Sequence, residues 1–183
     1  KEGDTKTPIG QQALPLSEPA RAPAEHPPQA ALPHVRLAAA IEGEISANRR
    51  MTAPDLQRMA EREFGGTLAS GKFTRADIYD ALELGVNRYI RANRELFNPA
   101  SDIYQARRAV DLLEKIKNDL PTQTVRAGEK EAMQQFSTPP DYAFAAAWMA
   151  KIEPGKDRVL EPSAGTGSIV APMMNAHPAE VMV

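Results

Sequence analysis

Near its carboxyl end, this 183-residue chain contains the segment that most constrains its fold. Residues 158–160 (Arg-Val-Leu) predict a buried strand, residues 161–167 form a glycine-containing turn, and residues 168–175 predict a helix. A second strand is expected to begin near Glu180. A strand, a glycine turn, a helix and a second strand form a βαβ unit, which indicates an α/β fold built on a parallel sheet.

The turn has the composition of a ligand-binding loop. Its residues are Glu161, Pro162, Ser163, Ala164, Gly165, Thr166 and Gly167. The two glycines permit a tight bend, and backbone N–H groups at a helix start point toward a ligand. The carboxylate of Glu161, at the carboxyl end of the strand, favours a cationic ligand. A dinucleotide is disfavoured because Val170 occupies the place of the third glycine, and a nucleoside-triphosphate loop is excluded because no Gly-Lys-Ser/Thr follows.

A second candidate segment lies upstream, at residues 135–140 (Gln-Phe-Ser-Thr-Pro-Pro). Thr138 is expected to cap a helix that begins at Pro139 and carries Asp141 in its first turn. A capped helix start with free N–H groups is a good site for a carboxylate. An ordinary capped helix start is the alternative for this segment taken alone.

Together the two segments resemble the signature of class I S-adenosylmethionine-dependent methyltransferases. Residues 161–167 resemble the Asp/Glu-Pro-x-x-Gly-x-Gly motif of that family. Residues 135–140 are similar to the Phe-x-Thr-Pro segment that precedes this motif in adenine-N6 DNA methyltransferases of type I and type IIG restriction–modification systems. The resemblance implies S-adenosylmethionine as the cofactor, with contacts from the turn and from Phe136, Ser137, Thr138 and Pro139. It also implies methyl transfer to adenine in DNA, for modification, restriction or anti-restriction.

We therefore expect a mixed fold, with an N-terminal all-α helical region followed by the start of an α/β Rossmann-like methyltransferase domain. The expected parts are a disordered Pro/Ala-rich linker at 1–34, a helical bundle at 35–121 and the incomplete N-terminal part of the methyltransferase domain at 128–183. The family's catalytic Asn/Asp-Pro-Pro-Tyr/Phe motif does not follow the glycine turn within these residues. No residue is therefore assigned to catalysis, and we expect the chain to belong to a longer polypeptide and to be inactive alone.

The expected helical bundle has clear helix starts and apolar stripes. Thr52 with Asp55 and Thr74 with Asp77 predict capping boxes, and Asn98 followed by a proline predicts a further helix start. The residues expected to face the core are Leu37, Ala40, Ile41, Ile45, Ile78, Leu82, Val86, Tyr89, Ile90, Ile103, Ala106, Val110, Leu113 and Leu120.

One face of the bundle is a candidate nucleic-acid surface. Arg88, Arg91 and Arg94 recur every three residues and are placed to meet phosphates. The alternative is a solvated helix face, because acidic residues lie close by. The formal net charge of -2 supplies no bulk basicity for nucleic acid.

Composition and resemblance leave two alternatives to the DNA methyltransferase open. One is a helical DNA-binding or interaction module of a larger helicase-containing protein, since the leader and helices are similar to phage and plasmid proteins that join a methyltransferase to a helicase. The other is a methyltransferase of RNA or protein. The chain has no cysteine, no apolar run of about 20 residues and no signal-peptide pattern. We expect DNA as a partner of the full-length protein, no membrane or metal partner, and a cytoplasmic location.

Overall fold

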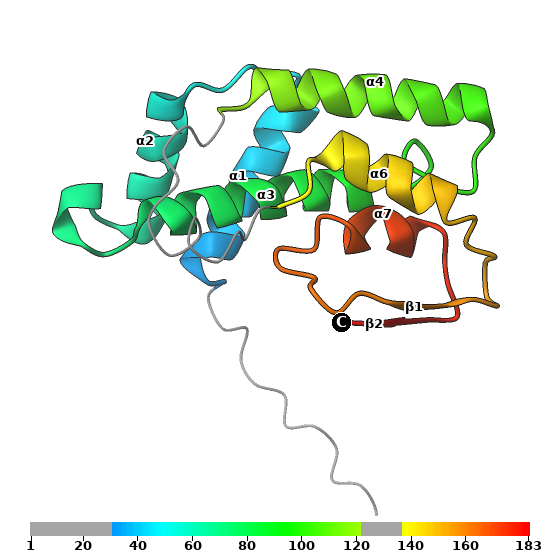
Figure 1. The fold of residues 1–183 in the computed structure, drawn as a ribbon. Coiled ribbons are helices and arrows are strands. Elements are labelled where there is room, and N and C mark those ends of the chain that lie inside the picture. Colours follow the sequence, from blue (N-terminus) through cyan, green and yellow to red (C-terminus); the bar gives the residue numbers. More distant parts are fainter. Residues whose placement is uncertain (1–30, 122–136) are drawn as a thin grey trace, which may run out of the picture. The chain divides into compact units, whose positions relative to one another are not determined.

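The computed structural model describes residues 31–121 and 137–183. Nearly all of the expected linker, and Phe136 of the upstream candidate segment, lie outside these residues. In chain order the described elements are α1 (Pro33–Ser46), α2 (Ala53–Phe64), the 3-10 turn η1 (Leu68–Ser70), α3 (Arg75–Ala92), α4 (Ile103–Asp119), α6 (Pro140–Met149), β1 (Arg158–Leu160), α7 (Val170–Asn175) and β2 (Glu180–Met182) (Figure 1). The described part of the chain is thus mainly helical, with a small parallel sheet.

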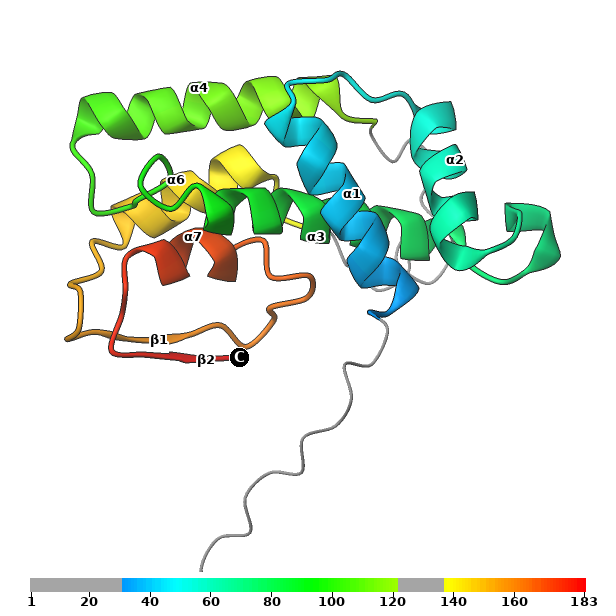
Figure 2. The same ribbon diagram turned by 180° about the vertical axis from the view of Figure 1, so that it is seen from behind.

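Helices α1 and α3 form the centre of the helical region. They cross in direct contact, as Figures 1 and 2 show from opposite sides. The buried residues of α1 are Leu37, Ala38, Ile41 and Ile45, so Ala38 replaces the predicted Ala40 on the buried face. Gly85 of α3 is buried at the crossing, close to Ile41 of α1. The small residue allows the two backbones to approach closely.

The predicted capping boxes of α2 and α3 are confirmed. In α2 the Asp55 N–H donates to Thr52 Oγ1 over 3.3 Å, and the Thr52 N–H donates to Asp55 Oδ2 over 2.9 Å. In α3 the reciprocal pair between Thr74 and Asp77 has distances of 3.2 and 2.7 Å. Each box satisfies N–H groups that lack partners at the first turn of a helix. These local signals were correct because both partners lie within one turn.

The predicted start of α4 is wrong by several residues. Asn98 does not cap a helix; its Oδ1 accepts from the Ala100 N–H over 2.9 Å and so forms a local turn. The cap is Asp102, whose Oδ1 accepts from the Gln105 N–H over 2.8 Å. Because an Asn side chain can satisfy a turn as readily as a helix start, the local pattern was ambiguous. The shift leaves Ile103, predicted to be buried, 57% exposed.

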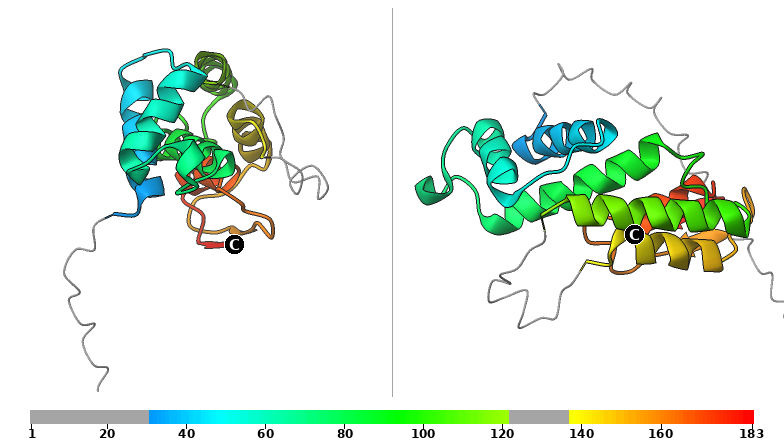
Figure 3. Two further views of the ribbon diagram at one scale, coloured as in Figure 1. Left: turned by 90° about the vertical axis from the view of Figure 1, so that its left-hand side faces the viewer. Right: turned by 90° about the horizontal axis from the view of Figure 1, so that it is seen from above.

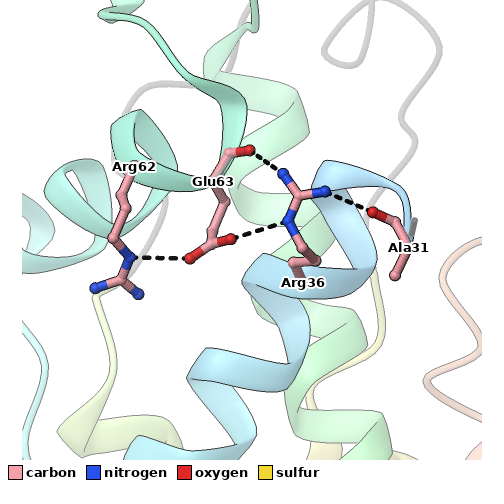
Figure 4. A network of polar contacts seen from close by, with 4 residues as sticks. All are labelled: Ala31, Arg36, Arg62 and Glu63. Atoms are coloured by element: carbon pink, nitrogen blue, oxygen red, sulfur yellow. Dashed lines mark hydrogen bonds and ion pairs between the residues drawn. The ribbon is translucent and has the colours of Figure 1, made fainter.

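Ion pairs join α1 to the helices that follow it. The Arg36 guanidinium binds Glu63 Oε2 over 3.1 Å and also donates to the Glu63 and Ala31 carbonyls (Figure 4). Hydrogen bonds from Arg62 and Arg36 outweigh burial and lower the pKa of Glu63. Glu63 therefore stays charged in the pair that holds the end of α2 against the start of α1.

His34 supplies a second contact between α1 and a following helix. Its Nε2 lies 2.9 Å from Oδ1 of Asp77 at the start of α3, and its ring packs edge-on against Phe64 of α2. Pro33 and His34, assigned to the linker from sequence, thus form the first residues of α1.

Helix α6 lies beside α4, and α7 contacts both α3 and α6 (Figure 3). Phe144 and Ala147 of α6 are fully buried, and Trp148 Nε1 donates to the Ser101 carbonyl over 3.0 Å. Phe144 meets Phe97, which follows α3, with ring centroids 6.4 Å apart. The helices expected in two separate parts of the chain thus share one core.

The predicted strand–turn–helix–strand order is confirmed, whereas burial of the first strand is wrong. Strands β1 and β2 pair in parallel, with Val159 opposite Val181 and Leu160 opposite Met182. Leu160 is 66% exposed and Val159 is half-buried. Among the described residues the sheet has only two strands, and α7 packs on α3 and α6. The apolar side chains of β1 are therefore not fully buried. The helix predicted at 168–175 begins at Val170, because 165–169 form a turn.

No helix among residues 31–121 and 137–183 combines the length and apolarity needed to cross a bilayer. In the same ranges, no group of three or more His, Cys, Asp or Glu side chains is arranged to hold a metal ion.

Candidate functional site

The glycine turn joins the carboxyl end of β1 to α7. The Glu161 N–H donates to the Met182 carbonyl over 2.9 Å and extends the parallel pairing by one residue. Glu161 Oε1 then accepts from the Ser163 N–H over 2.9 Å. The Gly167 N–H closes the bend on the Ala164 carbonyl over 2.7 Å. The result is a compact turn with a carboxylate at its entrance.

The two glycines of the turn are required by its backbone. Gly165 has φ 52° and Gly167 has φ 89°, conformations that L side chains rarely adopt. A Cβ on either residue would meet no atom closer than 3.9 Å, so backbone conformation, not crowding, calls for glycine. The amides of Ala164, Gly165 and Thr166 form no hydrogen bond with the described residues. Such N–H groups are available to an acceptor atom of a ligand.

Helix α3 contacts the turn through two side chains one helical turn apart. Thr166 Oγ1 donates to Glu83 Oε2 over 2.6 Å, and Asn87 Nδ2 donates to the Thr166 carbonyl over 2.9 Å. Asn87 is only 6% exposed. The helical region therefore holds Thr166, which lies between the two glycines of the turn, through both its side chain and its backbone.

The upstream candidate segment reaches the same carboxylate. Ser137 Oγ donates to Glu83 Oε2 over 2.6 Å, the oxygen that also accepts from Thr166. Two hydrogen bonds to one oxygen of Glu83 thus link Ser137 of the upstream segment to Thr166 of the glycine turn. Glu83 lies in α3, outside both segments.

The predicted cap of the upstream helix is wrong. Helix α6 begins at Pro140, its N-cap is Pro139, and no side chain caps it. Thr138 is half-buried and the extended backbone at Pro139 (φ -55°, ψ 144°) starts the helix one residue later than predicted. Two consecutive prolines fix this geometry, because the residue before a proline is pushed out of the helical region. Thr138 is therefore not a helix cap.

Asp141 in the first turn of α6 is buried and paired. It is 8% exposed, and its Oδ2 accepts from Lys117 Nζ of α4. The hydrogen bond to Asp141 raises the pKa of Lys117. Oδ1 of Asp141 has no partner among the described residues. This aspartate serves the packing of α6 on α4.

The arginines proposed to meet nucleic acid have different surroundings. Arg88 Nε binds Glu42 Oε2 over 2.7 Å, and Arg91 Nη1 donates to Asn175 Oδ1 over 2.6 Å. Arg94 is exposed. Two of the three therefore have partners inside the protein, and they join α3 to α1 and to the end of α7.

A groove lies beside the glycine turn, between α3 and α7. Its volume is about 360 Å³, and it is shallow and open to solvent. The residues that line it are Glu42, Leu84, Asn87, Arg88, Arg91, Thr166, Gly167, Val170, Ala171 and Met174. Thr166 and Gly167 belong to the glycine turn and also line the groove. A ligand bound at the turn would therefore border the groove.

The remaining predicted site residues lie on the turn itself. Pro162, Ser163 and Gly165 are exposed, whereas Glu161 and Ala164 are half-buried. Sequence reasoning missed Glu83 and Asn87. The available signal was their spacing: they lie four residues apart in α3, and Asn87 interrupts an apolar stripe, where a polar residue needs a partner.

Comparison of the chain with protein-family models, with curated proteins and with solved structures gave no match.

Proposed function

We propose that this chain binds S-adenosylmethionine at the glycine turn and forms the cofactor-binding part of a DNA adenine-N6 methyltransferase. One observation carries the proposal. Ser137, from the segment that resembles Phe-x-Thr-Pro, and Thr166, from the segment that resembles Asp/Glu-Pro-x-x-Gly-x-Gly, both bind Glu83 Oε2. Two segments that resemble parts of one cofactor site are thus adjacent although they are distant in sequence.

The chemistry of the turn fits this cofactor. S-adenosylmethionine carries a cationic sulfonium and an ammonium group, and the Glu161 carboxylate at the end of β1 favours positive charge. Glu161 uses Oε1 for the Ser163 N–H, and Oε2 has no partner among the described residues. The open amides of Gly165 and Thr166 can donate to polar atoms of the ligand.

In this proposal the residues of the chain bind and orient the cofactor. The cofactor supplies an activated methyl group, which is transferred to the exocyclic nitrogen of adenine as the methyl–sulfur bond breaks and the nitrogen loses a proton. No residue of this chain is assigned to that transfer. DNA and the residues that hold the flipped base belong to the full-length protein of the proposal.

The proposal is tested by calorimetry of the chain with S-adenosylmethionine. We expect Gly165→Ala to weaken binding by about tenfold, since a left-handed residue costs about 1–2 kcal/mol when it gains a Cβ. Gly155→Ala is the matched control, because Gly155 has φ 68° at the opposite end of β1 and its Cβ would also meet open space. This control should bind like the unchanged chain.

Two results would contradict the proposal. A chain that shows no cofactor binding but a salt-dependent affinity for DNA would favour the helical DNA-binding module. Equal weakening by Gly155→Ala and Gly165→Ala would show that the turn is not the binding site. Separately, methyl transfer to duplex DNA by the 183 residues would disprove the expectation that they are inactive alone.

A further inference from the structure

One face of α3 carries a polar seam, which consists of Glu83, Asn87 and Arg91 at intervals of four residues. All three side chains bind the segment that runs from the glycine turn to the end of α7. Glu83 and Asn87 bind Thr166, and Arg91 binds Asn175. The amide of Asn175 also donates to the carbonyls of Ile90 and Phe97, each over 3.1 Å. The seam therefore fixes α7 and its preceding turn at both ends.

Glu83 differs from the other two members because it joins two segments. Its Oε2 accepts from the Ser137 and Thr166 hydroxyls, with both distances 2.6 Å. Hydrogen bonds from a hydroxyl to a carboxylate are short and roughly twice as strong as those between neutral groups. Glu83 is half-buried; its bond to Thr166 is partly shielded from water, whereas its bond to Ser137 is exposed.

The hydrogen bonds that Thr166 makes with Glu83 and Asn87 restrain the backbone of the glycine turn. Thr166 lies between Gly165 and Gly167, the two residues of the turn with positive φ. Glycine loses the most conformational freedom on folding, so a bend with two glycines is ordered by external contacts. Glu83 and Asn87 supply those contacts from a helix whose start is fixed by its own capping box.

We infer that Glu83 is a positioning residue for the cofactor site and sets the distance between the glycine turn and Ser137. This inference rests on the proposed function. The carboxylate acts through Ser137 and Thr166, which border the ligand, and it orders both before the cofactor arrives. A binding site that is already ordered loses less conformational entropy when the ligand binds, and its affinity is therefore higher.

The test compares Glu83→Ala with Glu83→Gln in the full chain. Alanine removes both hydrogen bonds, and we expect the S-adenosylmethionine affinity to fall by about 10- to 100-fold. Glutamine keeps one acceptor oxygen and should restore part of the affinity. Thr74→Ala is the matched control, because it weakens the start of α3 by removing its cap without contacting either segment.

A second measurement does not depend on the cofactor. Amide exchange of Gly167, whose N–H is bonded to the Ala164 carbonyl, reports order in the turn of the cofactor-free chain. We expect Glu83→Ala to accelerate this exchange and Thr74→Ala, at a comparable loss of unfolding free energy, to leave it nearly unchanged.

The outcomes separate the inference from the proposed function. Cofactor affinity and Gly167 exchange that are unaltered in Glu83→Ala would overturn the inference and leave the proposed function intact. Equal losses in Glu83→Ala and Thr74→Ala would also overturn it, because Glu83 would then act only through stability. An unchanged chain that fails to bind S-adenosylmethionine would overturn the proposed function and, with it, the cofactor role of Glu83.

Discussion

Gly85 of α3 provides a direct test of the packing between α1 and α3. A Cβ at this position would lie 2.7 Å from Ile41 Cγ2, 2.9 Å from Ile41 Cβ and 3.0 Å from the Ala38 carbonyl oxygen. Ile41 and Ala38 are both fully buried. The Cβ of Ile41 and the Ala38 carbonyl are fixed to the backbone of α1, so no rotamer change can relieve the contact.

Two opposing effects decide the result of Gly85→Ala. Alanine is the better helix former, which favours the variant by about 1 kcal/mol. Forcing extra volume into a close-packed core costs about 1–3 kcal/mol. Because two of the three contacts involve atoms that cannot move without moving α1, we take the upper part of that range. The expected net loss of unfolding free energy is about 1–2 kcal/mol.

Urea unfolding followed by circular dichroism measures this loss. Gly43→Ala is the control, because Gly43 lies within α1 and a Cβ there would meet no atom within 4 Å. That variant should gain about 0.5–1 kcal/mol from helix propensity alone. If Gly85→Ala is as stabilising as Gly43→Ala, the close approach of α1 and α3 described above is incorrect.

Two further predictions concern aspartates that pair with other side chains. Lys117→Met should lower the unfolding free energy by about 2 kcal/mol, because it leaves the buried Asp141 carboxylate without its cation. Adding Asp141→Asn should recover much of that loss in a urea-unfolding cycle, and additive losses would contradict the pairing. Burial opposes ionisation of Asp77, but hydrogen bonds from His34 and Thr74 prevail and lower its pKa below the ordinary 3.8. The stability that Asp77 contributes is therefore present above pH 3.8 and lost as the pH falls through its lower folded-state pKa. The difference in unfolding free energy between the unchanged chain and Asp77→Asn should persist from neutral pH down to about 3.8 and shrink as the pH falls below that value; a difference that stays constant below pH 3.8 would refute the assignment.

Several features could be predicted because they depend on neighbouring residues. The capping boxes at Thr52 and Thr74 each involve a partner three residues away. The order of β1, turn, α7 and β2 follows from short apolar runs separated by glycines and a proline. The errors arose where two local solutions compete: Asn98 forms a turn instead of a cap, and consecutive prolines move the start of α6 past Thr138.

The sequence by itself determined where α2 and α3 begin, that a parallel strand pair encloses a glycine turn, and which two segments merit attention as a ligand site. Only the tertiary structure decided that Ser137 and Thr166 bind one oxygen of Glu83, and that Arg88 and Arg91 are occupied by Glu42 and Asn175. The physical reason is range. A cap or a glycine bend is fixed by bonds within a few residues, whereas a carboxylate on α3 acquires its partners only when packing brings distant parts of the chain against that helix.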